Sequence, residues 1–232
     1  MTMSSRSILA LVVAVLVVWA AVAYLLMPAW WERYARRHPA LDDVPGLTQT
    51  GSGIPGDPVN VALAGTEQQV RAIFAAAKWN PADPLSLKSD VEIAAGAVLD
   101  RPYADAPVSN LYLFGRKEDL AFEQSVGSSP RERHHVRFWR APKAHASGAP
   151  LWIGSASFDR SVGLSHTTGQ ITHHIAADID TERNHVIASL NATGKLADIV
   201  PVEGFHTVRE GRNGGGDPWR TDGTLVLGVI SE

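Results

Sequence analysis

The 232-residue sequence contains no cysteine. This absence excludes disulfide bonds, zinc sites with thiolate ligands and cysteine nucleophiles. The sequence also lacks an excess of basic residues, because 21 Lys and Arg stand against 24 Asp and Glu, a formal net charge of −3. Nucleic-acid-binding domains normally carry a basic face or arm, so we expect no nucleic-acid partner.

Charge is also missing from a long segment near the amino terminus. Residues 7–27, SILALVVAVLVVWAAVAYLLM, carry no charged side chain, and about 20 apolar residues suffice to cross a bilayer as a helix. Trp30 and Trp31 follow, where aromatic rings favour the membrane interface. The run is long for a cleaved signal peptide. We therefore predict that residues 1–31 are a single-pass anchor in the cell (inner) membrane and that the membrane is one partner of the chain.

The orientation of this anchor rests on opposing signals. Arg33, Arg36 and Arg37 come after the apolar run, and basic residues tend to stay on the cytoplasmic side. A short basic tail before a first helix, here with Arg6, is the usual layout of an anchor that exports the downstream domain. The second signal weakly favours a soluble domain on the exported side.

The rest of the chain is predicted to be a tether and one domain. Residues 32–58 include a stretch rich in Pro and Gly without apolar periodicity, which is typical of a linker. Residues 59–232 are long enough for a single domain with one hydrophobic core.

Hydrophobic periodicity predicts an α+β domain from residue 59 onward. Residues 67–78 and 181–190 show helical patterns, with Thr66 and Asp180 as expected N-caps. Residues 91–98 are predicted to be helical or irregular. Segments rich in β-branched and aromatic residues predict strands at residues 59–63, 111–114, 120–124, 134–139, 151–157, 171–176, 199–208 and 224–230. A regular βαβ alternation is missing, which favours a mostly antiparallel sheet with two or three flanking helices.

Several long blocks in this order resemble the LssY C-terminal domain family. They are PGDPVNVALAGT (55–66), APVSNLYLFGRKEDLAFEQ (106–124), RERHHVRFW (131–139), SVGLSHTTGQITHHIAADIDTERN (161–184) and GRNGGGDPWRTDG (211–223). The resemblance implies no settled activity. In larger relatives this domain is joined to membrane-embedded DedA-type and phosphatidic-acid-phosphatase-like domains, which implies work at the cell envelope. This chain has only one expected anchor helix, so no phosphatase activity carries over from those domains.

Histidines are concentrated in one part of the domain. Six of the nine lie in strand-like or tightly turned segments between residues 131 and 206: His134, His135, His166, His173, His174 and His206. Side chains alternate between the two faces of a strand. If the apolar face points into the core, the opposite face carries His135 and Arg137 on one strand and Thr172 and His174 on another.

This polar face predicts a site for an anion and for acid-base chemistry. Guanidinium pairs with phosphate or carboxylate, and imidazole exchanges protons near neutral pH. We take His135, His174 and Asp178 as candidate catalytic residues, and Arg137 and Thr172 as candidate anion-binding residues. A second candidate set could hold a divalent metal as cofactor, and it consists of His166, His173 and Asp180.

Structural roles explain the same residues without a site. A buried histidine is more often a hydrogen-bonded core residue than a ligand, Asp180 fits an N-cap and Asp178 fits a turn. No HExxH spacing is present. The glycine-rich loop at residues 213–217 could cradle a phosphate, but its flanking strands favour a hairpin loop.

Two functional hypotheses arise from the sequence. The first is a membrane-anchored hydrolase that acts on an anionic or phosphorylated cell-envelope component through a His/Asp site. The alternative is a non-catalytic accessory domain that binds a lipid headgroup or a partner membrane protein.

Overall fold

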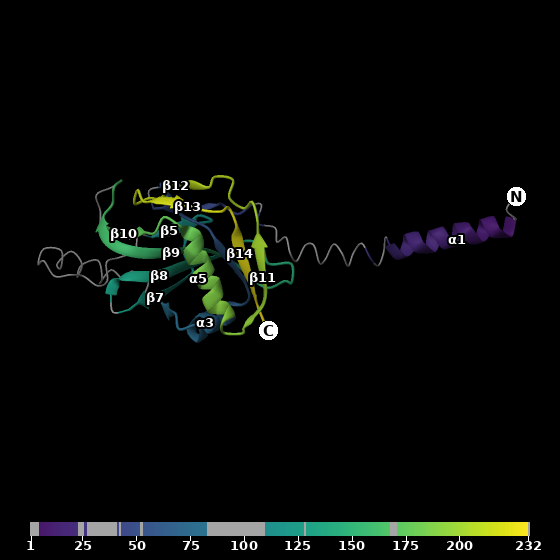
Figure 1. Cartoon of the computed structure of the whole chain (residues 1–232), viewed down its shortest axis with the longest axis horizontal. Helices are drawn as coiled ribbons and strands as arrows, with labels where there is room; N and C mark the ends of the chain where they lie inside the picture. The colour runs from purple at the N-terminus through teal and green to yellow at the C-terminus, as the bar shows by residue number, and fades with distance from the viewer. Residues whose placement is uncertain are drawn as a thin grey trace, which may run out of the picture. The chain divides into compact units, whose positions relative to one another are not determined.

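The computed structural model describes residues 5–22, 26, 41, 43–51, 53–82, 110–127, 129–167 and 171–231. They belong to two units, residues 1–40 and residues 41–232, and each is considered by itself. The second unit has antiparallel-rich sheets with helices (Figure 1), which confirms the predicted α+β class. The segment 91–98 lies outside the described residues.

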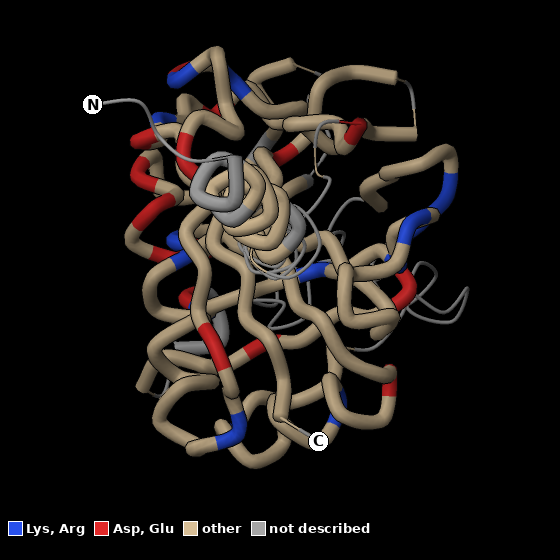
Figure 2. The backbone as a smooth tube through the Cα atoms, turned by 90° about the vertical axis from the view of Figure 1, so that its right-hand side faces the viewer, with Lys and Arg blue, Asp and Glu red and all other residues tan. Residues whose placement is uncertain are grey.

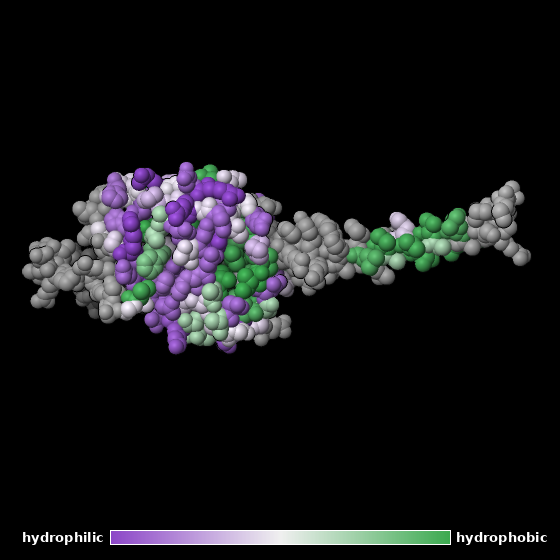
Figure 3. Space-filling model, in the orientation of Figure 1, coloured by the Kyte–Doolittle hydropathy of each residue, from purple (hydrophilic) through white to green (hydrophobic). Residues whose placement is uncertain are grey.

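The first unit contains helix α1, Ser5–Ala21. Its surface is hydrophobic along most of its length (Figure 3), and side chains such as Leu11, Val15 and Leu16 are more than half exposed. Among the residues that the structure describes, no helix is both long enough and apolar enough to span a bilayer. The predicted transmembrane helix is therefore not supported by the structure, and Trp30 and Trp31 lie outside the described residues.

A large sheet forms the centre of the second unit. The order across the sheet is β11 (Leu196–Val202), β14 (Leu225–Ile230), β3 (Val61–Ala64), β9 (Leu151–Leu164), β8 (Ser129–Arg140), β7 (Leu120–Val126) and β4 (Asn80–Pro81). Strand β10 (Ile171–Ile175) pairs with β9, and β14 and β3 are parallel while the other neighbours are antiparallel. Strand β11 is shorter than the segment 199–208 predicted from sequence, because the chain turns after Val202.

Helices α3 (Glu67–Ala76) and α5 (Ile179–Asn191) cover one face of this sheet (Figure 1). Thr66 caps α3 as predicted and forms a reciprocal capping box with Gln69. The predicted N-cap of α5 is wrong, because the helix begins earlier and Asp178 accepts the backbone N–H of Thr181. Asp180 instead lies inside the first turn.

Two smaller sheets lie beside the large one. The first has the order β2 (Pro55–Pro58), β1 (Leu47–Thr50), β5 (Leu111–Leu113) and β6 (Arg116–Lys117), and the second pairs β12 (Glu210–Arg212) with β13 (Pro218–Arg220). The predicted tether, residues 32–58, therefore needs correction, since β1 and β2 belong to the folded unit that begins at Leu41. These strands form because β1 pairs with β5, which is distant in sequence.

Both faces of the large sheet contribute to a hydrophobic core. On the helical side, Phe74 of α3 stacks on Phe122 of β7 at a ring distance of 4.1 Å. On the other side, Trp139 of β8 packs in a cluster with Leu111 and Leu113 of β5. Alternation along β8 therefore places neighbouring residues in different layers, which determines where its polar side chains point.

Charged residues of both signs are interspersed along the described backbone (Figure 2). This distribution gives no extended basic stripe in the described part of the chain. It agrees with the small net charge of the sequence.

Candidate functional site

A polar cavity of about 290 Å³ lies on the face of the large sheet that is opposite the helices. Strands β8, β9 and β10 supply one wall, strands β1, β2 and β5 supply another, and the β12–β13 loop contributes to the lining. The polar and charged side chains that line it are Thr50, Asp57, Asn110, Tyr112, His135, Arg137, Ser157, Asp159, Ser165, Thr172, His173 and Asn213.

Strand β8 presents two of the predicted residues to this cavity. His135 and Arg137 are both 4% exposed and lie on the same face of β8. Their neighbour His134 points to the helical side, where its Nδ1 is 2.7 Å from Glu182 of α5. The predicted alternation along β8 therefore brings His135 and Arg137 together with Thr172 at one cavity.

The guanidinium of Arg137 is buried but has no carboxylate within hydrogen-bond distance among the described residues. Its guanidinium nitrogens lie 3.9 Å from an oxygen of Asp57 and 3.8 Å from an oxygen of Glu118, distances beyond ordinary hydrogen bonds. The Asp57 carboxylate instead accepts a hydrogen bond of 2.9 Å from the amide of Asn213. Burial raises the pKa of Asp57, while Arg137 acts in the opposite direction.

His135 lies beside a buried carboxylate on β9. Its Nδ1 is 4.0 Å from Asp159, and Asp159 accepts a hydrogen bond of 3.1 Å from Arg133. Burial raises the pKa of Asp159 to about 6. Burial and the positive charges of Arg137 and Arg133 hold the pKa of His135 well below its usual range. His135 is therefore a neutral imidazole at neutral pH.

On strand β10, His173 rather than His174 reaches the cavity. The alternation in the sequence predicted that Ile175 faces the hydrophobic core and that His174 shares the polar face. In the structure Ile175 pairs with Asp159 at a register shift, and Ile175 and His173 both line the cavity. The side of β10 that carries Ile175 therefore meets the polar cavity and not the hydrophobic core. The prediction that His174 lies on the polar face with His135 is wrong, and His173 lies there instead.

The hydrogen-bond pattern of His173 defines its protonation. Burial, reinforced by Arg133 and Arg137, lowers the pKa of His173 to about 4, so the ring is neutral at neutral pH. Its Nε2 lies 3.3 Å from a guanidinium nitrogen of Arg133, which can only donate. The proton of the neutral ring therefore resides on Nδ1. This buried Nδ1 has no hydrogen-bond partner among the described residues.

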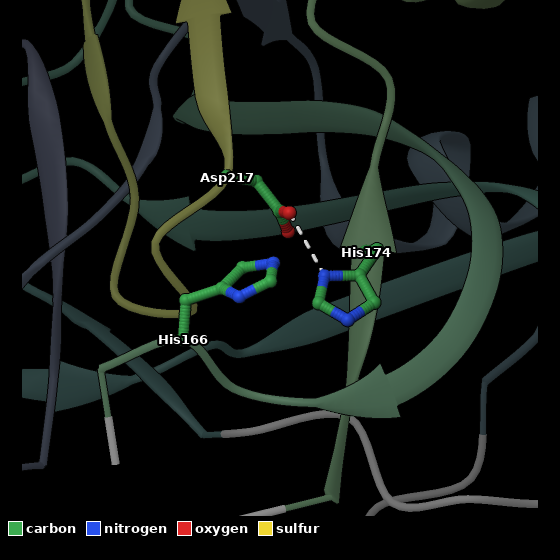
Figure 4. Close-up of side chains that lie close together, drawn as sticks. All are labelled: His166, His174 and Asp217. Atoms are coloured by element: carbon green, nitrogen blue, oxygen red, sulfur yellow. Dashed lines mark hydrogen bonds and ion pairs between the residues drawn. The ribbon is translucent and has the colours of Figure 1, made fainter. Parts of the chain in front are cut away.

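His174 and His166 form a second group beside the cavity. The Nδ1 of His174 lies 2.8 Å from a carboxylate oxygen of Asp217, and the ring centroids of His166 and His174 are 5.2 Å apart. Figure 4 shows a ring nitrogen of His166 turned toward the other two side chains. The structure thus separates the candidate His174 from His135 and places it with His166.

The two aspartates proposed from sequence lie elsewhere. Asp178 caps α5 and forms an ion pair of 3.2 Å with Arg220. Asp180 accepts hydrogen bonds from the Thr221 hydroxyl and from the backbone N–H of Asp222. Both carboxylates are occupied in connecting α5 to the segment after β13, so neither joins the histidines.

Three carboxylates that the sequence did not single out lie at the cavity or beside the histidines. Asp57 was assigned to the tether, and Asp159 follows a strand that was predicted to end at residue 157. Asp217 belongs to the glycine-rich loop, which forms the predicted hairpin between β12 and β13. The signal for Asp159 was present in the sequence, because the alternation that includes Ser155 and Ser157 continues to it.

Comparison with known proteins identifies the family of the chain. The family described as LssY C-terminus matches residues 41–225, which include both candidate sites and most of the second unit. No curated protein and no solved structure matches the chain. The chain belongs to the LssY C-terminus family.

Proposed function

We propose that the cavity binds an anionic, phosphorylated group of a cell-envelope component and that the protein hydrolyses it. One observation carries this proposal: within the described part of the chain, two residues that line the cavity each have a buried donor group without a close partner. These groups are the guanidinium of Arg137, whose nearest carboxylate oxygens are 3.8 and 3.9 Å away, and the Nδ1–H of His173. Unsatisfied buried donors are costly, and a bound oxyanion would satisfy both.

His135 is the proposed general base. Its Nδ1 faces Asp159, which leaves Nε2 to accept a proton from a water molecule that attacks the phosphorus atom. The bond between phosphorus and the ester oxygen breaks, and the alcohol leaves with a proton from the imidazolium or from solvent. Asp159 would stabilise the imidazolium that forms, in the way that a carboxylate supports a catalytic histidine. A bound anion would offset the charge of Arg137, one of the causes that lower the pKa of His135.

The dimensions of the cavity limit the part of the substrate that enters. A volume of about 290 Å³ lies at the lower end of the range for small-molecule sites, roughly 300–1,000 Å³. A phosphorylated headgroup fits this space better than a complete lipid. The acyl part of a lipid substrate would then remain outside the cavity.

The proposal includes attachment to the cell (inner) membrane through residues 7–27. Support comes from the uncharged run in the sequence and from the exposed apolar side chains of α1. Membrane attachment would confine the cavity near lipid-linked substrates. We place the soluble unit on the exported side, on the ground of the short basic tail before the apolar run.

The anchor predicts a specific fractionation result. The full chain should remain in the membrane pellet after alkaline carbonate extraction, because an apolar helix in the bilayer is not released by loss of charge. A variant in which Leu11 and Val15 are both replaced by arginine should shift to the supernatant, since each buried arginine costs about 2.5–3.5 kcal/mol in a membrane helix. Release of the unaltered chain by carbonate would contradict the anchor.

Anion binding is predicted to strengthen as pH falls. Sulfate is a suitable probe because it remains a dianion between pH 5 and 8. Asp159 has a raised pKa of about 6, so it becomes neutral as pH falls through this value and no longer repels the anion. We expect sulfate affinity, measured by calorimetry on the full chain in detergent, to rise by at most about tenfold per pH unit as pH falls from 8 toward 6, and to level off below pH 6, where Asp159 is already protonated.

The same titration tests the role of Arg137. Arg137→Lys retains the charge but removes the planar fork, and we expect a loss of at least about tenfold in sulfate affinity. Arg71→Lys is the matched control, because Arg71 forms an exposed ion pair with Glu67 on α3. Equal affinities in the two variants, or an affinity independent of pH, would exclude the cavity as the anion site.

Sulfate binding without turnover of any phosphoester would favour the alternative function, a non-catalytic accessory domain. The lowered pKa of His135 also suits that alternative, because it makes the imidazole a weaker base.

A further inference from the structure

The group formed by His166, His174 and Asp217 has the composition of a metal site. Each residue offers one ligand atom, and these three atoms lie within 4.8 Å of one another. Their side chains converge on one point from different segments, as Figure 4 shows. His174 comes from β10, Asp217 immediately precedes β13, and His166 follows β9.

The backbone around this group holds two ligands rigidly. Asp217 is 1% exposed, and its second carboxylate oxygen accepts the backbone N–H of Ile175 at 3.3 Å. Its own backbone N–H donates to the side-chain oxygen of Asn213. Asp217 therefore keeps one oxygen directed at His174 while the other is fixed to the strand that carries His174.

The third ligand is more exposed but is still connected to the same loop. The backbone N–H of His166 donates to the carbonyl of Gly215 at 2.9 Å. Gly216 has a φ of +87°, and a Cβ at this position would lie 2.8 Å from the Cβ of His166. The close approach of the two segments thus depends on glycine.

We propose that His166, His174 and Asp217 bind a divalent transition-metal ion of the Zn²⁺ class. Two imidazoles and one carboxylate match the ligand preferences of such ions, whereas Mg²⁺ and Ca²⁺ prefer sites made of oxygen ligands. A tetrahedral ion with bonds of about 2.0–2.2 Å holds its ligands roughly 3.3 Å apart. Because the His166 side chain is exposed, its ring can rotate and bring its ligand nitrogen from within 4.8 Å of the other two ligand atoms to this shorter distance.

Three protein ligands leave one coordination position open. Such sites differ from closed structural sites with four protein ligands and are typical of metals that hold water or a ligand group. The group lies beside the polar cavity, because Gly215 lines the cavity and a Cβ on Gly215 would lie 3.6 Å from a carboxylate oxygen of Asp217. Cation binding by these three residues does not depend on whether the cavity hydrolyses a phosphoester.

The experiment measures metal binding without any substrate. The full chain in detergent, treated with chelator, is titrated with Zn²⁺ by calorimetry, and Co²⁺ binding is followed through its visible absorption. We expect one Zn²⁺ per chain and no comparable binding of Mg²⁺. His166→Ala should weaken Zn²⁺ binding by more than about tenfold, since even loss of an outer-shell partner costs about 10–100-fold.

Two further variants separate ligation from structural effects. Asp217→Asn retains the size of the side chain and should lower the affinity for Zn²⁺ and change the Co²⁺ spectrum. His185→Asn is the matched control, because His185 lies on α5, on the opposite face of the large sheet, and should leave binding unchanged. A lack of stoichiometric Zn²⁺ binding would overturn the proposal. Equal Zn²⁺ affinities for His166→Ala and His185→Asn would do the same.

Discussion

Replacement of His135 by asparagine is expected to lower the turnover number for a hydrolysed phosphoester by about 10²–10⁴-fold, the usual contribution of a general base. Asparagine fills similar space in the buried site but cannot accept the proton of the attacking water. The affinity for sulfate should change much less, because Arg137 and His173 remain. The measurement is steady-state hydrolysis of a set of phosphomonoesters and phosphodiesters by the full chain.

The control for this prediction is again His185→Asn. His185 stacks on His134 at a ring distance of 3.7 Å on the helical side of the sheet, so its replacement should leave turnover unchanged. Thermal unfolding of each variant verifies that the folded fraction is the same. If both variants hydrolyse the substrate at the rate of the unaltered chain, His135 is not the base.

Replacement of Arg183 by methionine is expected to reduce the free energy of unfolding by about 1.5–3 kcal/mol, the loss expected for hydrogen bonds to a charged group, because Arg183 is buried while its partner Asp222 is half exposed. Arg183 is 5% exposed, and its two terminal nitrogens donate to the two oxygens of Asp222 at 2.8 and 2.9 Å. It also donates to Asp180 and to the carbonyl of Thr224. Methionine removes one donor from each of these acceptors, although Asp180 still accepts from Thr221 and the half-exposed Asp222 still accepts from the backbone N–H of Thr224. Urea unfolding followed by circular dichroism gives the difference.

Arg220→Met provides the matched comparison for this prediction. Arg220 pairs with Asp178, but its side chain is 70% exposed, and exposed ion pairs contribute only about 0–1 kcal/mol. A loss of stability as large as that of Arg183→Met would show that burial is not the cause.

The Arg183 network also predicts a dependence of stability on pH. The hydrogen bond from Arg183 lowers the pKa of Asp222 from 3.8 to about 2. The folded state therefore binds a proton at Asp222 less readily than the unfolded state. The stabilisation from this group is fully present above pH 4 and declines as pH falls from about 4 to 2. It should be smaller in Arg183→Met, where hydrogen bonds from Thr224 still lower the pKa of Asp222.

Local patterns in the sequence predict much of the second unit. The capping box at Thr66 depends on residues within one helical turn, and the alternation along β8 depends on a single strand, so both are readable without long-range information. His135 and Arg137 were correctly placed on one face for this reason. The boundaries of α5 and β11 are less accurate, because helix and strand ends depend on contacts with other segments.

The errors at the candidate site have a common physical origin in pairing between distant segments. Residues 47–58 have few strand-forming side chains, yet β1 forms because β5 pairs with it. Asp57 reaches the cavity only through this pairing. The alternation along β10 holds, because His173 and Ile175 lie on the same side and both line the cavity. Which side of β10 meets the cavity depends on how the strand pairs with β9, and this pairing leaves no clear local signature.

The loop between β12 and β13 connects the two candidate sites mechanically. Its residue Asn213 donates to Asp57 in the cavity and accepts from the backbone N–H of Asp217 in the histidine group. A ligand that moves Asp57 or Asp217 would therefore act on the other carboxylate through Asn213 and change the affinity of the other site. Thermodynamic reciprocity then requires that any effect of a cation on anion affinity be matched by an equal effect of the anion on cation affinity. One short hairpin loop would thus make the two sites parts of a single allosteric unit.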